Sequence, residues 1–159
     1  MARRLVELLT AAGIPVSGFT TEEIREGRRR VGFSVEAIRG PRAVLSHVDL
    51  PGPPRVGKYG VDLKSFERVA LPSLHPRPGV VVVDEIGKME LASAAFREAV
   101  KDLLDGSTPI VATVHAFRHP FTDHLKRRPN IEVIRVTAAS RDSLPDLLAD
   151  RLGRATSQA

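Results

Sequence analysis

An acidic pair that follows four consecutive valines is the part of the sequence best suited to chemistry. In "VVVVDEIGKMEL", residues 80–83 precede Asp84 and Glu85. Carboxylates at the carboxyl end of a buried parallel strand lie where α/β sheets bind ligands. There, one carboxylate can hold Mg²⁺ and its neighbour can orient or deprotonate an attacking water molecule. The pattern predicts a Walker B arrangement in which Asp84 binds the metal and Glu85 is catalytic. The alternative is an acidic pair that merely ends a strand at the surface.

The residues around this pair are predicted to line a nucleotide site. A glycine at position 87 would let the chain turn sharply after the strand, and Lys88 could approach a phosphate or pair with Glu90. The predicted nucleotide-binding residues of this stretch are Val81, Val82, Val83, Asp84, Glu85, Ile86, Gly87 and Lys88.

A second segment, "GPPRVGKYG" at 52–60, nearly matches the phosphate-loop pattern G-x-x-x-x-G-K-[ST]. Pro53 and Pro54 remove two N–H donors, and Tyr59 stands where the small hydroxyl residue should be. A polar stretch precedes the segment, and no helix follows it directly. We therefore interpret this segment as a loop that does not bind phosphate.

Hydrophobic periodicity predicts an α/β protein whose second half alternates strands and helices. The N-terminal half reads as antiparallel hairpins, with Gly27 at the tip of a charged turn. The predicted helices are 2–12, 62–74, 93–104, a short one from 120, and 143–152, and the predicted strands are 14–19, 31–38, 43–48, 80–84, 108–114 and 131–136. Residues 1–152 are expected to form a single domain and residues 153–159 a flexible tail.

Taken together, the motifs resemble a family of nucleoside-triphosphatases first described from thermophiles and also called cancer-related nucleoside-triphosphatases. The matching pieces keep the family's order along almost the whole chain. They are Gly18-Phe19, Thr21-Glu22-Glu23, Arg25, Gly32-Phe33, Tyr59-Gly60-Val61, Asp84 to Leu91, Ala112-Thr113, and Thr137 with Arg141-Asp142. The resemblance implies a P-loop NTPase-like, mostly parallel sheet flanked by helices. It also favours Arg141 as a further nucleotide contact, ahead of Arg118, Arg127 and Arg128.

The sequence departs from this family at its start. In the family, a strand and the Walker A phosphate loop precede the first helix, whereas "MARRLVELL" resembles the helix itself. We therefore expect the first strand and the P-loop to be missing from these 159 residues. A start codon assigned too late is favoured over true truncation. We also expect the absent strand to leave the Walker B strand without a neighbour.

Composition limits the other possibilities. The formal net charge is +5 and the sequence pI about 10.2, which suits a nucleotide, nucleic acid or a membrane surface. Cysteine is absent, and neither a signal peptide nor a transmembrane stretch is evident, so we expect a cytoplasmic protein with no membrane partner. His115, His119 and His124 read as a loop of solvated histidines.

The leading hypothesis is Mg²⁺-dependent hydrolysis of ATP, GTP and other nucleoside triphosphates to the diphosphate and phosphate. Broad base tolerance is what the resemblance implies. Without the Walker A lysine and hydroxyl, we expect the chain as written to hydrolyse poorly or not at all. One alternative is a degenerate, non-catalytic nucleotide-binding or regulatory module. A less favoured one is a basic RNA-binding protein, since "GRRRVG" has no interleaved aromatic residues on which bases could stack.

Overall fold

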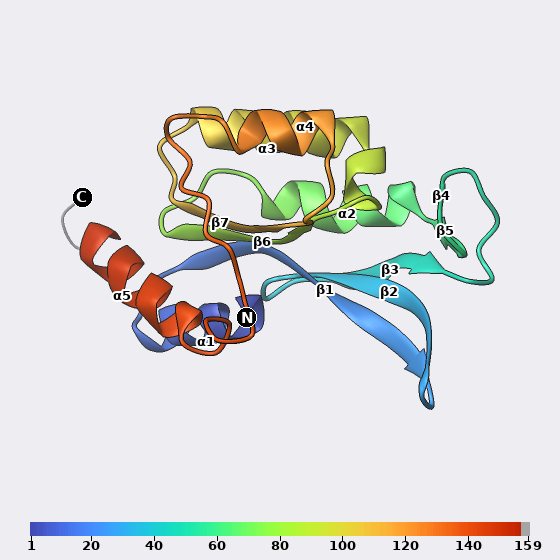
Figure 1. Cartoon of the computed structure of the whole chain (residues 1–159), viewed down its shortest axis with the longest axis horizontal. Coiled ribbons are helices and arrows are strands. Elements are labelled where there is room, and N and C mark those ends of the chain that lie inside the picture. The colour runs from blue at the N-terminus through green and yellow to red at the C-terminus, as the bar shows by residue number, and fades with distance from the viewer. Residues whose placement is uncertain (157–159) are drawn as a thin grey trace.

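The computed structural model describes residues 1–156 as one mixed sheet with helices on both of its faces (Figure 1). The helices are α1 (Ala2–Ala11), α2 (Leu63–Ser73), the 3₁₀ turn η1 (Glu90–Ala92), α3 (Ala94–Asp105), α4 (Pro120–Leu125) and α5 (Leu144–Thr156). The strands are β1 (Val16–Glu26), β2 (Arg29–Ala37), β3 (Arg42–His47), β4 (Arg55–Val56), β5 (Tyr59–Val61), β6 (Val80–Ile86) and β7 (Ile110–Val114).

The strand order is β4-β5-β3-β2-β1-β6-β7. Strand β6 pairs in parallel with β1 on one side and β7 on the other. The remaining pairs are antiparallel and come from the N-terminal half of the chain. The α/β class and the antiparallel hairpins are therefore confirmed. The expectation that the Walker B strand lacks a neighbour is wrong, because β6 is paired along both edges.

Strand β6 is buried on both faces, as its run of valines predicts. Val81 and Val83 belong to a core beneath α2 and α3, whereas Val80 and Val82 belong to a second core beneath α1 and α5. Figure 1 shows these helix pairs on opposite sides of the sheet. Alternate side chains of a strand point to opposite faces of the sheet. Four consecutive valines can therefore all be buried only if helices cover both faces.

The helices that cover the first core begin where the sequence predicts. Asp62 accepts a hydrogen bond from Ser65 N–H at the start of α2, and Ser93 caps α3 through Phe96 N–H. These caps satisfy N–H groups that have no partner within their own helix. The helices deliver Phe66 and Phe96 to Phe19 of β1, with ring centroids 5.2–5.9 Å apart.

Most element boundaries differ from the sequence prediction by one or two residues, and three differences are larger. Strand β1 continues through the charged segment to Glu26, because the ion pairs of its acidic residues allow that segment to pair with β2. The predicted loop before residue 62 contains the short hairpin β4–β5. Helix α5 continues to Thr156, so residues 153–156 are helical, contrary to the predicted tail. The rest of that tail, 157–159, lies outside the described residues.

The largest departure is at the β7 edge of the sheet. Residues 131–137 form no strand, although 131–136 were predicted as one. Val133, Ile134 and Val136 are 59%, 39% and 47% exposed. Strand β7 itself is only partly buried rather than fully buried, because β6 is its one strand partner within residues 1–156. A strand needs a paired neighbour to satisfy its backbone, and the described chain places none between β7 and 131–137.

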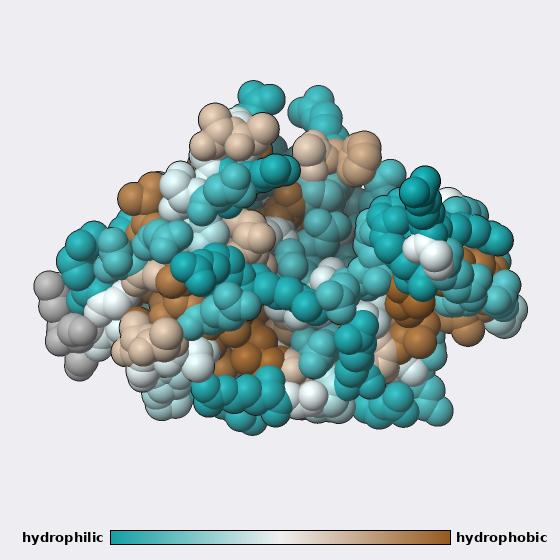
Figure 2. Space-filling view, turned by 90° about the horizontal axis from the view of Figure 1, so that it is seen from below, coloured by the Kyte–Doolittle hydropathy of each residue, from teal (hydrophilic) through white to brown (hydrophobic). Residues whose placement is uncertain are grey.

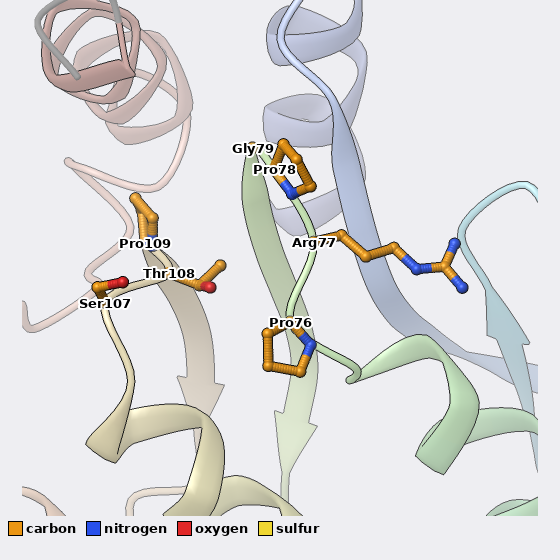
Figure 3. A pocket seen from close by; sticks show the side chains of 7 residues that line it. All are labelled: Pro76, Arg77, Pro78, Gly79, Ser107, Thr108 and Pro109. Atoms are coloured by element: carbon orange, nitrogen blue, oxygen red, sulfur yellow. The ribbon is translucent and has the colours of Figure 1, made fainter.

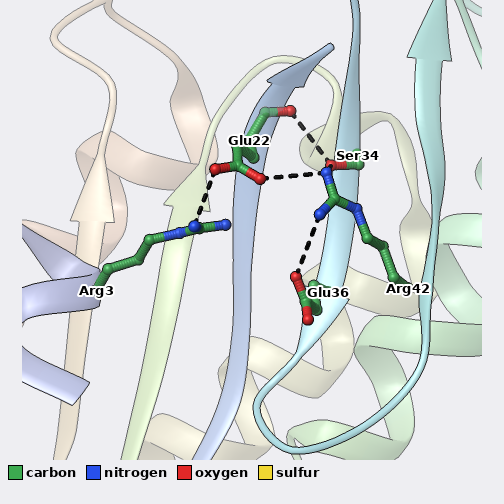
Figure 4. A network of polar contacts seen from close by, with 5 residues as sticks. All are labelled: Arg3, Glu22, Ser34, Glu36 and Arg42. Carbon is green, nitrogen blue, oxygen red and sulfur yellow. Dashed lines mark hydrogen bonds and ion pairs between the residues drawn. The ribbon is translucent and has the colours of Figure 1, made fainter. Parts of the chain in front are cut away.

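The conspicuous acids of "TTEEIR" form ion pairs across the surface of the sheet, and Figure 4 shows those of Glu22. Glu22 of β1 pairs with Arg3 of α1 at 2.9 Å and with Arg42 of β3 at 3.1 Å, and Arg42 also reaches Glu36 at 3.6 Å. Glu23 pairs with Arg25 and Arg30. This stretch therefore joins three strands and a helix. These ion pairs give the two acids a structural role.

Polar residues dominate the face seen in Figure 2, with smaller hydrophobic areas between them. Among the described helices, none is both long and apolar enough to cross a membrane.

Candidate functional site

Asp84 and Glu85 lie near the carboxyl end of β6, between two parallel strands, as predicted. Both side chains are half-buried. The pairing of β6 with β7 runs in register to Val83 and resumes at Ile86 opposite Val114, with one extra residue on β6. Such a bulge re-aims side chains, and bulges are common beside active sites. Here it falls on the acidic pair.

The neighbouring strand holds Asp84 in place. Thr113 of β7 donates a hydrogen bond from Oγ1 to Oδ1 of Asp84 at 2.5 Å. A hydrogen-bonded carboxylate has a fixed orientation, which favours metal binding through its remaining lone pairs. Sequence reasoning did not assign this role to Thr113. The available signal was a hydroxyl residue at the end of the next parallel strand.

Glu85 shares its surroundings with a second, deeply buried carboxyl group. Burial, followed by the charge of Asp84, raises the pKa of Glu85. Glu90 is only 3% exposed, and burial raises its pKa to about 7. Glu90 accepts the N–H of Gly87 at 3.1 Å. A Cβ atom at position 87 would lie 2.5 Å from Oε1 of Glu85 and 2.8 Å from Oε2 of Glu90, so glycine is the residue that fits between them.

The other predicted site residues lie on β6 or directly after it, and they differ in exposure. Val81, Val82, Val83 and Ile86 are buried in the cores, so they hold the strand in place and offer no side chain to a ligand at its end. Lys88 is exposed and does not pair with Glu90. Its Nζ lies 4.4 Å from the centre of the Phe117 ring, in the loop after β7.

Arg141 is not brought to this group. Its side chain is 65% exposed, and its Nε lies 3.5 Å from Asp142. Within residues 1–156 no hydrogen bond or ion pair joins it to residues 81–88. Its role as a nucleotide contact stays a prediction.

The near-match to a phosphate loop forms a hairpin on the opposite edge of the sheet. Residues 55–61 make β4 and β5, with a turn at Gly57 and Lys58. Tyr59 is 7% exposed, packs edge-on against Phe33 and accepts a hydrogen bond from Arg30. The segment leads into a strand instead of a helix, so it lacks the strand–loop–helix geometry of a P-loop.

The prediction of a solvated histidine loop is wrong for one residue. His124 is exposed, and His119 is partly buried and caps α4 by accepting the N–H of Phe121. His115, at the end of β7, is only 9% exposed, because residues of the next loop and of α4 close over it.

A hollow of about 370 Å³ lies at the other end of the strands. It is lined by the segments Pro76–Gly79 and Ser107–Pro109, which lead into β6 and β7 (Figure 3). Arg77 is its one charged residue, and Figure 3 shows that side chain pointing away from the hollow. Ligands of α/β sheets bind beyond the carboxyl ends of the strands, so this hollow does not compete with the acidic pair as the candidate site.

The donors around Asp84 suit Mg²⁺. In nucleotide sites this ion usually takes one or two carboxylates and completes its coordination with water and substrate phosphates. Within residues 1–156 no group of three or more acidic or histidine side chains could hold a metal by itself. One carboxylate, oriented by a threonine, fits an ion that arrives together with phosphate.

Comparison with known proteins agrees with this geometry. Residues 1–149 match the family described as NTPase, and the chain belongs to this family. It is 39% identical over 147 residues to the nucleoside-triphosphatase THEP1 of Thermotoga maritima, and the aligned region covers 91% of this chain and 82% of that protein.

Two solved structures share the fold. The crystal structure of THEP1 from Aquifex aeolicus has a TM-score of 0.83 at 30% identity, covering 95% of this chain and 91% of its own. The solution structure of a human cancer-related nucleoside triphosphatase has a TM-score of 0.79 at 39% identity, covering 94% and 87%.

Proposed function

We propose that this protein hydrolyses nucleoside triphosphates to the diphosphate and phosphate in a Mg²⁺-dependent reaction at the carboxyl end of β6. The observation that carries the proposal is the acidic pair itself. Asp84 is oriented by Thr113 at 2.5 Å, and Glu85 lies beside it in a desolvated position. The names of the relatives support the same reaction class.

The two carboxylates have different environments and therefore different roles. Asp84 is hydrogen-bonded and would hold Mg²⁺, which when bound neutralises charge on the phosphates. Glu85 has a raised pKa and would orient the attacking water and accept its proton. A base is more effective when its pKa approaches the working pH, and desolvation moves Glu85 in that direction.

We further propose that the complete site also contains a strand and a phosphate loop, which the described residues lack. The free edge of β7 and the lack of strand pairing at residues 131–137 support this idea, because one inserted strand could pair with both. Backbone N–H groups at the start of the next helix would then hold the phosphates. The helix α1, which lacks a side-chain cap at Met1, is placed to follow such a loop.

We propose ATP and GTP as substrates, with broad tolerance of the base, in the cytoplasm. The roles proposed for Asp84 and Glu85 concern the metal, the attacking water and the phosphates, and neither residue is proposed to contact the base. The sequence carries no motif for reading a base, which is compatible with recognition of the triphosphate alone.

The test compares phosphate release from ATP and GTP, with and without Mg²⁺, by the 159-residue protein and by a form extended with the in-frame upstream sequence. We expect an active extended form and at least about a hundredfold less activity in the shorter one, because several phosphate contacts are lost together. If neither form releases phosphate but both bind nucleotide, the protein is a non-catalytic nucleotide-binding module and the proposal is wrong.

A further inference from the structure

His115 is the one buried histidine in the described chain whose two ring nitrogens both lack a hydrogen-bond partner. Its side chain is 9% exposed, so water does not readily replace the missing partners. Burying a polar group without a partner lowers stability, and native proteins rarely keep such groups without a reason. An apolar residue of similar size would avoid this cost.

The position of His115 connects it to the proposed reaction. It directly follows β7, and its N–H faces the carbonyl oxygen of Ile86 at 3.4 Å. The imidazole therefore belongs to the same end of the sheet as Asp84 and Glu85. Thr113, two residues earlier, contacts Asp84 directly.

The charges around the ring favour an anion. Lys126 donates from Nζ to the carbonyl oxygen of His115 at 3.3 Å, and Nζ of Lys88 lies 4.4 Å from the centre of the neighbouring Phe117 ring. Burial, and then the charges of Lys126, His119 and Lys88, lower the pKa of His115, with Asp123 acting weakly in the opposite direction. A neutral imidazole carries one N–H donor, which suits a phosphate oxygen among these cations.

An exposed aromatic side chain lies beside the imidazole. The Phe117 ring lies 5.9 Å from the imidazole at an angle of 30°, and Phe117 is 62% exposed. Exposed side chains change rotamer quickly, so Phe117 need not block a ligand.

We infer that His115 donates a hydrogen bond to the terminal phosphoryl group of the nucleoside triphosphate. This inference rests on the proposed function, since it names a contact for that substrate. A hydrogen bond to the transferred group becomes stronger as negative charge shifts in the transition state. Such a bond therefore raises kcat more than it lowers KM.

The experiment uses the extended form as the parent, together with three variants of it. His115→Leu removes both nitrogens, His115→Asn still offers an N–H donor, and His124→Ala removes an exposed histidine as the matched control. We expect His115→Leu to lower kcat at least about tenfold with a smaller change in KM, and His115→Asn to recover part of the loss. The control should hydrolyse as the parent does.

Stability separates this role from a structural one. Without nucleotide, His115→Leu should melt at the same temperature as the parent or a few degrees higher, because two unpaired polar atoms leave the interior. A marked drop in melting temperature would show that the imidazole serves packing, and the inference would be wrong.

A binding measurement keeps the result independent of turnover. In a Glu85→Gln background, Mg-ATP should raise the melting temperature more than Mg-ADP does, and His115→Leu should remove that difference. Suppose that the parent hydrolyses ATP and that His115→Leu changes neither kcat nor the difference between the melting temperatures with Mg-ATP and Mg-ADP. The inference then fails and the proposed function stands. If instead the parent hydrolyses nothing but the melting-temperature difference depends on His115, the proposed function fails and the phosphoryl contact stands.

Discussion

The hydroxyl group of Thr113 donates a 2.5 Å hydrogen bond to Oδ1 of Asp84 and joins the ends of β7 and β6. Thr113→Val keeps the shape of the side chain and removes the donor, so Asp84 loses its fixed orientation. In the extended form, we expect the Mg²⁺ concentration that gives half-maximal phosphate release to rise about 10–100-fold, because the proposed metal ligand loses its hydrogen-bond partner. Phosphate release measured over a series of Mg²⁺ concentrations gives this value.

Thr113→Ser is the matched control, because it retains the hydroxyl group. Its activity should stay within a few-fold of the parent. Equal Mg²⁺ requirements in the valine variant and the parent would show that the hydrogen bond does not serve metal binding.

Glu90 makes stability depend on pH. Burial raises its pKa from 4.5 to about 7 in the folded protein. Between these values the folded state binds more protons than the unfolded state, so the free energy of unfolding falls as pH rises and levels off above about pH 7. At about 1.4 kcal/mol per pKa unit, Glu90 costs up to roughly 3 kcal/mol at neutral pH.

Glu90→Gln removes this cost and still offers an oxygen to Gly87 N–H. We expect urea unfolding in the presence of a chelator to show a gain of about 2–3 kcal/mol near pH 8 and little gain near pH 4.5. Glu98→Gln on α3, whose side chain is 67% exposed, is the control. The same pH slope in the parent and the Glu90 variant would contradict this account of the buried carboxyl.

Lys58→Ala tests the interpretation of the near-match to a phosphate loop. Lys58 lies in the β4–β5 turn, on the sheet edge opposite β7. We expect nucleotide affinity within about twofold of the parent, since an exposed lysine away from the site contributes little. Isothermal titration with Mg-ATP measures it. A near-complete loss of binding would mean that this hairpin grips the phosphates after all.

The free edge of β7 predicts a difference in hydrogen exchange. In the 159-residue protein, the outward-facing amides of Ile110–Val114 have no strand partner in the described chain and should exchange quickly. In the extended form we expect the same amides to be protected, because the upstream strand pairs with them. Unchanged exchange rates would count against insertion of a strand at this edge.

The sequence predicted the parts of the fold that depend on local pattern. Four valines before Asp84 require cover on both faces, and Asp62 and Ser93 are strong caps, so β6, α2 and α3 followed directly.

Features that depend on tertiary contacts were harder to predict from the sequence. Residues 131–136 have the composition of a strand, but a strand forms only where a partner edge is present. For the same reason the sequence could not show which strand carries the free edge, and β7 rather than β6 proved to carry it.

The candidate site followed the same division. Asp84 and Glu85 were found because their motif is contiguous. The roles of Thr113, Glu90 and His115 depend on which strands are neighbours in the sheet and on which residues cover the loops. The spacing of residues along the sequence predicts neither of these. His115 shows this most clearly, because a histidine in a polar loop predicts solvation and the structure buries it.

The most direct test of the central claim is the effect of Glu85→Gln on phosphate release from Mg-ATP and Mg-GTP by the extended form. The substitution keeps the shape of the side chain and removes the group proposed to accept the proton of water. We expect kcat to fall about 10²–10⁴-fold, in the range of general-base catalysis, while nucleotide affinity stays within a few-fold. Glu98→Gln should change neither. Hydrolysis by Glu85→Gln at the parental rate would show that Glu85 is not the base that accepts the proton of water.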